Sequence, residues 1–186
     1  MTQTTVAVAK AAMRDIPNIL GLINSYAADG IMLPRTEFEM SENIRDFSVA
    51  YDGNVLIGCG ALHFYTPTVA EVRSLAVLPQ MKQHGIGRAV VEALEAEARE
   101  NELEAIFAFT YAPGFFSRLG FLEVERGELP LKAWKDCLRC PKFQSCDEIA
   151  VLKRLKAETR PFSHNLSNLA CNELVTLPTQ GKLTNN

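Results

Sequence analysis

The segment from Val77 to Ala89 constrains the fold of this chain more than any other part of the sequence. A strand that ends at Val77 is followed by Pro79, by a basic loop that contains Gly85 and Gly87, and by the start of a strongly amphipathic helix. The N-terminus of a helix directs unpaired backbone N–H groups and the positive end of the helix dipole toward one point. This order of elements therefore predicts a binding site for a phosphate or pyrophosphate group.

The composition of this loop supports the same interpretation. Lys82, His84 and Arg88 add positive charge, and glycines let the backbone approach an anion closely. Two better-known phosphate loops do not match. The sequence contains no Gly-x-x-x-x-Gly-Lys-Ser/Thr segment, and the dinucleotide fingerprint Gly-x-Gly-x-x-Gly would have Val90 at its third glycine. The loop alone leaves one alternative to a phosphate site open: a plain strand-to-helix turn whose glycines serve packing.

Hydrophobic periodicity and turn signals predict the other elements. The expected strands are residues 6–9, 47–51, 55–65, 71–77, 105–110, 121–124 and 148–152. The expected helices are residues 13–28, a short helix capped by Thr36 or Ser41, residues 86–99 and residues 113–119. The turn Asp52-Gly53-Asn54 predicts an antiparallel hairpin, and the long helix between two strands predicts one βαβ crossover. This mixture predicts an α+β fold.

Length and composition limit the possible classes of protein. A chain of 186 residues with 47% hydrophobic and 22% charged residues is typical of one globular domain and excludes disorder over most of its length. We expect a domain at residues 1–156, with a cysteine-containing insertion at 125–147. Residues 157–186 lack a clear period, and we expect a weakly ordered tail or one that packs on the domain.

Charge and hydropathy argue against two kinds of partner. The net charge of −3 argues against nucleic-acid binding as the main role, and no apolar run reaches the ~20 residues that span a bilayer. Without a secretory leader, we expect a cytoplasmic protein with reduced thiols. Basic residues gather between Lys132 and Lys156, which suits small anionic ligands but could also be ordinary surface. The sequence leaves a homodimer open.

Two segments resemble a known family. Lys82-x-x-Gly85-x-Gly87, after a strand that ends in Leu75-Ala76-Val77, resembles the acetyl-CoA loop of the GNAT acyltransferase superfamily, although Arg or Gln is commoner where Lys82 stands. Residues 115–121 resemble the family's "FYxxLGF" segment. The resemblance covers roughly residues 5–155. It implies a mixed sheet of six to seven strands flanked by about four helices, with acetyl-CoA as cosubstrate.

A narrower resemblance is to the short N-acetylglutamate synthases, which acetylate L-glutamate at the entry to arginine biosynthesis. The segments that carry it are residues 33–35, 42–47, 58–62, 73–77, 110–111 and 129–137. It implies acetylation of the α-amino group of an amino acid, above all L-glutamate, by direct attack in a ternary complex. A GNAT enzyme for another small amine or a protein N-terminus is one alternative, and a non-catalytic acyl-CoA sensor is another.

The resemblance also implies where the cofactor lies. The acetyl and pantetheine arm would follow the strand at 71–77, and the pyrophosphate would sit on the loop. The implied cofactor contacts are Leu75, Ala76, Val77, Lys82, Gln83, His84, Gly85, Ile86, Gly87, Arg88 and Phe116. Phe116 stands where many family members have a tyrosine that donates a proton to the thiolate. Tyr111 is the nearest substitute in the sequence, but the thiolate of coenzyme A could also leave without a proton donor.

Glu71 is the candidate general base. It begins the strand at 71–77, where several GNAT proteins keep a catalytic glutamate, and a carboxylate there could take the amine proton directly or through water. The alternative is an exposed carboxylate at the end of a strand.

Arginine side chains are the candidate substrate contacts, because their planar forks bind carboxylates in a bidentate manner and L-glutamate has two carboxylates. Arg35 matches an arginine that the resembling family uses for substrate. Arg73, with Ser74 beside it, lies on the same strand face as Glu71. Each arginine could instead be a solvated surface charge. Lys132, Lys135 and Arg139 rank behind them as candidates.

Three clustered cysteines, Cys137, Cys140 and Cys146, have a spacing that occurs in metal sites. The only fourth ligands that the sequence offers are weak candidates: Asp147, His164, Cys171 and Cys59. We therefore expect reduced thiols in the insertion and no resident metal. Cys59 lies in an apolar strand, and we expect it to be buried by packing rather than to act as a nucleophile with His63.

Overall fold

The computed structural model describes residues 6–129, 140, 142 and 145–156. Its strands are β1 (Val8–Lys10), β2 (Phe47–Asp52), β3 (Val55–Phe64), β4 (Val69–Val77), β5 (Ala105–Thr110), β6 (Leu122–Glu123) and β7 (Ile149–Arg154). Its α-helices are α1 (Ile16–Ala28), α2 (Glu37–Asn43), α3 (Ile86–Glu100) and α4 (Pro113–Ser117), and the short 3₁₀ turns are η1 (Met13–Asp15), η2 (Ile44–Asp46), η3 (Pro79–Met81) and η4 (Arg126–Glu128). These elements confirm the predicted order and the α+β class.

The seven strands form one mixed sheet in the order β1-β2-β3-β4-β5-β7-β6. The predicted hairpin is present as the antiparallel pair β2 and β3. β4 and β5 run parallel, which confirms the predicted crossover through α3. The last strand, β7, lies between β5 and β6 and is antiparallel to both.

One face of the sheet is covered by α3. Its buried residues Val90, Val91 and Leu94 pack with strand residues such as Leu62 and Val72 in one hydrophobic cluster. Two glycines of β3 let this helix come close. A Cβ atom on Gly58 would lie 2.8 Å from Ile86 Cγ2, and one on Gly60 would lie 2.9 Å from Val90 Cγ1. Side chains at these two positions would therefore push α3 off the sheet.

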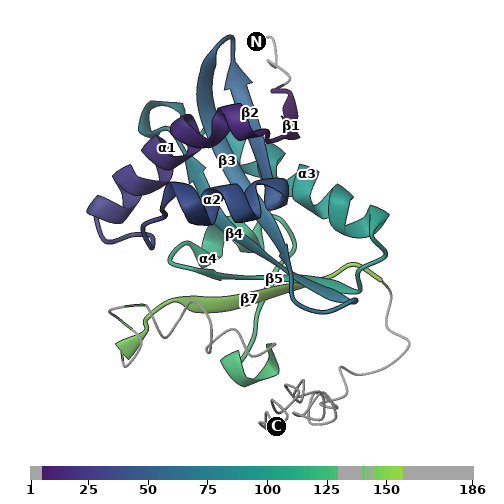
Figure 1. Ribbon diagram of the computed structural model, residues 1–186. Coiled ribbons are helices and arrows are strands. Elements are labelled where there is room, and N and C mark those ends of the chain that lie inside the picture. Colours follow the sequence, from purple (N-terminus) through teal and green to yellow (C-terminus); the bar gives the residue numbers. More distant parts are fainter. Residues whose placement is uncertain (1–5, 130–139, 141, 143–144, 157–186) are drawn as a thin grey trace, which may run out of the picture.

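The opposite face is covered by α1 and α2 over the first half of the sheet, where these helices cross the strands in Figure 1. Thr36 caps α2 as predicted: its Oγ1 accepts the N–H of Glu39, whose carboxylate accepts the N–H of Thr36 in return. A third apolar cluster includes Phe107 of β5 and Leu152 of β7. Between the region covered by these two helices and the third cluster, β3 and β4 carry the polar side chains described below.

Several predictions fall outside the described residues. These are the tail at 157–186 and the side chains of Lys132, Lys135, Cys137, Arg139, His164 and Cys171, so the domain bounds and the role of the insertion stay predictions. In the part of the chain that the structure describes, none of the helices has the length and apolar character that crossing a membrane requires.

Candidate active site

A β-bulge interrupts β4 in the segment along which the GNAT resemblance implies that the acetyl group lies. Ala61 pairs with Arg73 and Cys59 pairs with Ala76, so Ser74 and Leu75 lie opposite the single residue Gly60. Ser74 has a φ of 53°, in the left-handed region that non-glycine residues seldom adopt. A bulge of this kind bends the strand and turns its backbone groups in new directions.

The same strand separates from β5 beyond Glu71. The parallel ladder pairs residues 69–71 with residues 105–107 and ends there, whereas β4 continues to Val77. On its β5 side, the second half of β4 therefore offers backbone N–H and C=O groups that this ladder does not use. An extended ligand with amide groups can pair with such a strand edge. The pantetheine arm of a coenzyme A thioester has this character.

The predicted phosphate loop leads directly from β4 to α3. Gln83 and Gly85 both have positive φ values, 68° and 81°, and Gly85 is the N-cap of α3. The first backbone N–H groups of a helix have no carbonyl partner within that helix. In α3 these are the N–H groups of Ile86, Gly87 and Arg88, and they point toward the space that the loop surrounds. Backbone N–H groups that converge in this way are suited to bind an anion.

Three contacts fix this loop. Tyr26 of α1 donates a hydrogen bond of 2.6 Å to the carbonyl oxygen of Val77, and Lys82 Nζ lies 4.9 Å from the centre of the Tyr26 ring. The N–H of Leu78 donates to the carbonyl of Ile57 on the neighbouring strand. Sequence analysis missed Tyr26, whose helical spacing indicates only a core position.

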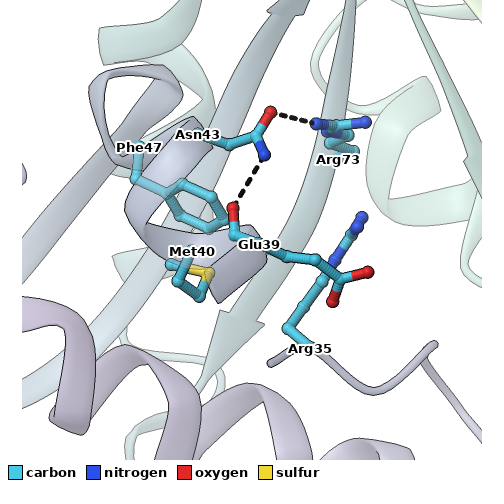
Figure 2. A pocket seen from close by; sticks show the side chains of 6 residues that line it. All are labelled: Arg35, Glu39, Met40, Asn43, Phe47 and Arg73. Atoms are coloured by element: carbon cyan, nitrogen blue, oxygen red, sulfur yellow. Dashed lines mark hydrogen bonds between the residues drawn. The ribbon is translucent and has the colours of Figure 1, made fainter. Parts of the chain in front are cut away.

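A pocket brings the two predicted substrate arginines together. It is lined by Arg35, Glu39, Met40, Asn43, Phe47 and Arg73, and Figure 2 shows both guanidinium groups directed into the same region. Asn24 of α1 holds the backbone of Arg35 on both sides: its Oδ1 accepts the N–H of Arg35 at 2.9 Å, and its Nδ2 donates to the carbonyl at 3.0 Å. The loop after α1 is therefore fixed next to the pocket.

Arg73 reaches the pocket from the middle of the sheet. Its side chain is only 8% exposed, so the alternative of a solvated surface charge is wrong for this residue. Its Nη2 donates to Asn43 Oδ1 at 3.5 Å and lies 3.8 Å from Asp46 Oδ2. Both partners come from the end of α2 and the turn after it, so this segment positions the guanidinium group.

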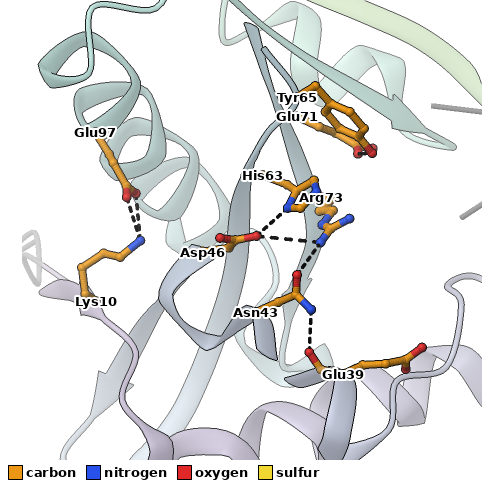
Figure 3. Close-up of polar contacts among 9 residues, drawn as sticks. All are labelled: Lys10, Glu39, Asn43, Asp46, His63, Tyr65, Glu71, Arg73 and Glu97. Carbon is orange, nitrogen blue, oxygen red and sulfur yellow. Dashed lines mark hydrogen bonds and ion pairs between the residues drawn. The ribbon is translucent and has the colours of Figure 1, made fainter. Parts of the chain in front are cut away.

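Glu71 lies on the same face as Arg73, two residues earlier in β4. It is 1% exposed, so the expected alternative of an exposed carboxylate at the end of a strand is wrong. Tyr65 donates a hydrogen bond of 3.1 Å to Glu71 Oε2, and His63 is the direct cross-strand partner of Glu71. Figure 3 shows these side chains along one face of the sheet. Sequence analysis did not assign Tyr65, His63 or Asp46 to the site, because only the strand register brings them there.

The candidate proton donor, Tyr111, lies just beyond β5 and is 42% exposed. Its hydroxyl donates to Asp147 at 2.9 Å and accepts from Lys142 at 3.1 Å. Burial raises the pKa of Tyr111, and the hydrogen bond to Asp147 adds to this effect against the opposing one of Lys142. These contacts tie Tyr111 to the segment before β7 rather than to Glu71, and its role as a proton donor stays a prediction.

Phe116 lies in the hydrophobic core. Its side chain is 4% exposed and makes edge contacts with Phe115 and Phe121 at 5.2 and 5.1 Å between ring centres. Phe115 is the aromatic residue closer to the loop, because a Cβ atom on Gly87 would lie 3.4 Å from its ring. The burial of Phe116 weighs against the predicted contact between this side chain and the cofactor. That contact stays a prediction.

The cysteines that the structure describes are Cys59, Cys140 and Cys146, and all three are free. Burial raises the pKa of Cys59 to about 12, which fits the expected packing role and not that of a nucleophile. Within the described ranges, His, Cys, Asp and Glu side chains form no group of three that could hold a metal ion.

Comparisons with known proteins agree with this geometry. Residues 19–121 match the Acetyltransferase (GNAT) family. An uncharacterized N-acetyltransferase of Chlorobaculum tepidum is 45% identical over 156 residues, which are 83% of this chain and 100% of that protein. An amino-acid acetyltransferase of Mycobacterium tuberculosis is 37% identical over 121 residues, 63% of this chain and 69% of that protein.

A solved structure shares the fold. It is N-acetylglutamate synthase from Neisseria gonorrhoeae in complex with coenzyme A and N-acetyl-glutamate, with a TM-score of 0.75 and 26% sequence identity. The similarity covers 84% of this chain but only 36% of that longer one.

Proposed function

The chain belongs to the GNAT family of acetyl-CoA-dependent N-acetyltransferases, and we propose that its acyl acceptor is the α-amino group of L-glutamate. The observation that carries this proposal is the pocket that both Arg35 and Arg73 line. Two guanidinium groups in one pocket suit a small molecule with two carboxylates. The amino-acid acetyltransferase and the N-acetylglutamate synthase among the similar proteins support the same substrate class.

Acetyl-CoA is the cosubstrate, and the proposed placement follows the strand, the loop and the helix in order. The pyrophosphate lies against the first-turn amides of α3, with Lys82 and Arg88 as flanking cations. The pantetheine arm and the acetyl group run along β4 from Val77 to Leu75, where the separation of β4 from β5 leaves strand-edge groups to pair with. This placement directs the thioester carbonyl toward the bulge next to the arginine pocket.

L-glutamate would use both arginines. One carboxylate pairs with Arg35, whose backbone Asn24 fixes, and the other pairs with Arg73. Met40 and Phe47 provide an apolar wall for the methylene groups of the substrate. Glu39 also lines this pocket, but its carboxylate takes part in capping α2 through Thr36, so the pocket is not built to attract a polyamine.

The reaction requires a neutral amine. In our proposal, the ammonium N–H bond breaks and the proton moves to Glu71, directly or over one water molecule. The nitrogen lone pair then forms a bond to the acetyl carbon, and the carbonyl oxygen becomes an oxyanion. Backbone N–H groups at the bulge stabilise this oxyanion; one such donor contributes about 2.7–4 kcal/mol in comparable sites. The C–S bond breaks last, and coenzyme A leaves as a thiolate.

The proposed acceptor is tested by measuring thiol release from acetyl-CoA with single amines. The panel holds L-glutamate, L-glutamine, putrescine and a short peptide with a free N-terminus. We expect the highest kcat/KM with L-glutamate. Faster release with another amine would replace the acceptor and leave the family function in place. Acetyl-CoA binding without release in any mixture would favour a sensor and overturn the proposal.

A further inference from the structure

His63 and Asp46 form a hydrogen-bonded pair next to the candidate base. His63 Nδ1 lies 2.6 Å from Asp46 Oδ2, and the two side chains are 16% and 22% exposed. An ionised carboxylate can only accept, so Nδ1 carries the hydrogen and, in the neutral imidazole, Nε2 is an acceptor. Asp46 therefore fixes one tautomer of His63 and leaves a basic nitrogen on the other side of the ring.

The register places this imidazole beside Glu71. The two residues face each other across β3 and β4, and directly opposed residues on one face of an antiparallel pair have Cβ atoms about 4.5–5.5 Å apart. The ring of Tyr65 meets the His63 ring edge-on at 5.0 Å, while its hydroxyl donates to Glu71. The titratable and charged side chains around His63 are thus Asp46, Tyr65, Glu71 and Arg73, as Figure 3 shows.

A buried base must be discharged after every turnover. Glu71 is 1% exposed, so a proton that it takes from the substrate ammonium has little direct access to solvent. His63 is more exposed, and the two ring nitrogens of an imidazole can accept a proton and donate one. A group with these two properties suits proton transfer between a buried carboxyl and water.

We propose that His63 relays the proton of the substrate ammonium from Glu71 to solvent, with Asp46 as the residue that orients it. This inference rests on the proposed function only in requiring that an ammonium group lose a proton to Glu71. The O–H bond of the protonated Glu71 breaks and an N–H bond forms at His63 Nε2, directly or over one water molecule. Asp46 stabilises the resulting imidazolium, which then gives a proton to bulk water. His63 is therefore a positioning and relay residue, not the group that contacts the amine.

His63→Asn is the sharpest variant, because the amide nitrogen of asparagine can keep the hydrogen bond to Asp46 while the basic Nε2 is lost. His63→Gln is a second variant in case the first does not fold, which circular dichroism and Tm will establish. The assay uses whichever amine the wild-type enzyme acetylates fastest, so a different acceptor leaves the test valid. A third variant is Asp46→Asn. Its control is Asp52→Asn, the same substitution at the exposed end of β2.

We expect His63→Asn to lower kcat about tenfold or more and to leave KM for acetyl-CoA within about twofold. Free imidazole in the assay should restore part of the lost kcat in the variant and leave the wild type unchanged. Asp46→Asn should lower kcat and also raise KM for the amine, because Asp46 neighbours Arg73, whereas Asp52→Asn should change neither. A kcat within twofold of the wild type, or a loss that imidazole does not restore in a folded variant, overturns the relay. No turnover with any amine overturns both the relay and the proposed function.

Discussion

Arg35 and Arg73 line the same pocket, although Arg35 lies in the loop after α1 and Arg73 lies in the middle strand of the sheet. A different set of contacts holds each of the two arginines in place. Asn24 fixes the backbone of Arg35, and the segment from α2 to η2 holds the guanidinium of Arg73 through Asn43 and Asp46. The pocket is therefore built by the packing of two helices on β4.

The first prediction concerns this pocket. Arg73→Gln removes a charge that a carboxylate would pair with, so KM for L-glutamate should rise by about tenfold or more, equivalent to at least about 1.4 kcal/mol. Arg35→Gln should have an effect of the same kind. Neither change should alter KM for acetyl-CoA, because the proposed cofactor site lies on the other side of the bulge. Steady-state kinetics with each substrate varied in turn measure both constants.

Arg45→Gln is the matched control for these variants. Arg45 is exposed in η2, next to Asp46, and its change should leave both KM values as they are. Equal effects of all three arginine variants on KM for L-glutamate would mean that general surface charge, not the pocket, attracts the substrate.

The loop before α3 gives the second prediction. Gly85 has a φ of 81°, and a residue with a Cβ atom in this region costs roughly 1–2 kcal/mol. Gly85→Ala should therefore lower Tm and raise KM for acetyl-CoA severalfold, since the loop amides no longer converge. Gly21→Ala is the control: it lies in α1 with no atom within 4 Å of an added Cβ, and it should leave KM unchanged. An unaltered KM for acetyl-CoA in Gly85→Ala would separate the loop from cofactor binding.

Cys59 provides a prediction about reactivity. Burial raises its pKa to about 12, so at pH 8 it is a thiol and not a thiolate, and no reagent reaches it in the folded protein. Mass spectrometry after iodoacetamide treatment should find Cys59 unmodified in native protein and modified after denaturation. Cys59→Ala should keep the reaction mechanism, although the small cavity it leaves lowers stability. Rapid alkylation of native Cys59 would contradict this burial.

The fourth prediction concerns stability and pH. Burial raises the pKa of Glu95, but hydrogen bonds from Lys153 and Arg99 lower it by more, so the net shift is downward. Lys153 Nζ lies 2.5 Å from Glu95 Oε2 and thereby joins β7 to α3. Because the pKa is lowered on folding, the ionised Glu95 stabilises the protein above the ordinary value of 4.5, and this contribution disappears as the pH falls through the lower pKa of the folded state.

Glu95→Gln should therefore lower the free energy of unfolding by about 1–2 kcal/mol at pH 7 and by progressively less below pH ~4.5. Urea denaturation at several pH values measures the difference. Glu100→Gln, at the exposed end of the same helix, is the control and should change little. If the loss in free energy of unfolding caused by Glu95→Gln stayed constant down to pH 3, the ionised carboxylate would not be its cause.

Most of the fold could be predicted because its signals are local. The helix at 86–99 and the strand at 105–110 differ from the observed α3 and β5 by at most one residue. Amphipathic periodicity and Gly85 mark the start of the helix, and a short apolar run marks the strand. The place of β7 between β5 and β6 could not be predicted, because strand order depends on packing between segments that are distant in the sequence.

The candidate residues were predicted where the GNAT resemblance implied a role, as for Arg35 and Glu71, or where a charge shares a strand face with such a residue, as for Arg73. His63 and Asp46 were not predicted, because a histidine in a strand and an aspartate after a helix become a pair only through the register of β3 and the turn η2. The alternative of an exposed Glu71 was wrong because β4 begins at Val69, earlier than the sequence pattern indicates, and this places Glu71 inside the sheet.

The most direct test of the account is the identity of the product that the enzyme makes when it can choose. Purified protein is incubated with acetyl-CoA and an equimolar mixture of the twenty common amino acids and putrescine, and mass spectrometry identifies the acetylated products at early times. We predict N-acetyl-L-glutamate as the main product, with its fraction lower in Arg73→Gln and unchanged in Arg45→Gln. A main product that carries a single carboxylate or none would contradict the two-arginine pocket as the determinant of the acyl acceptor.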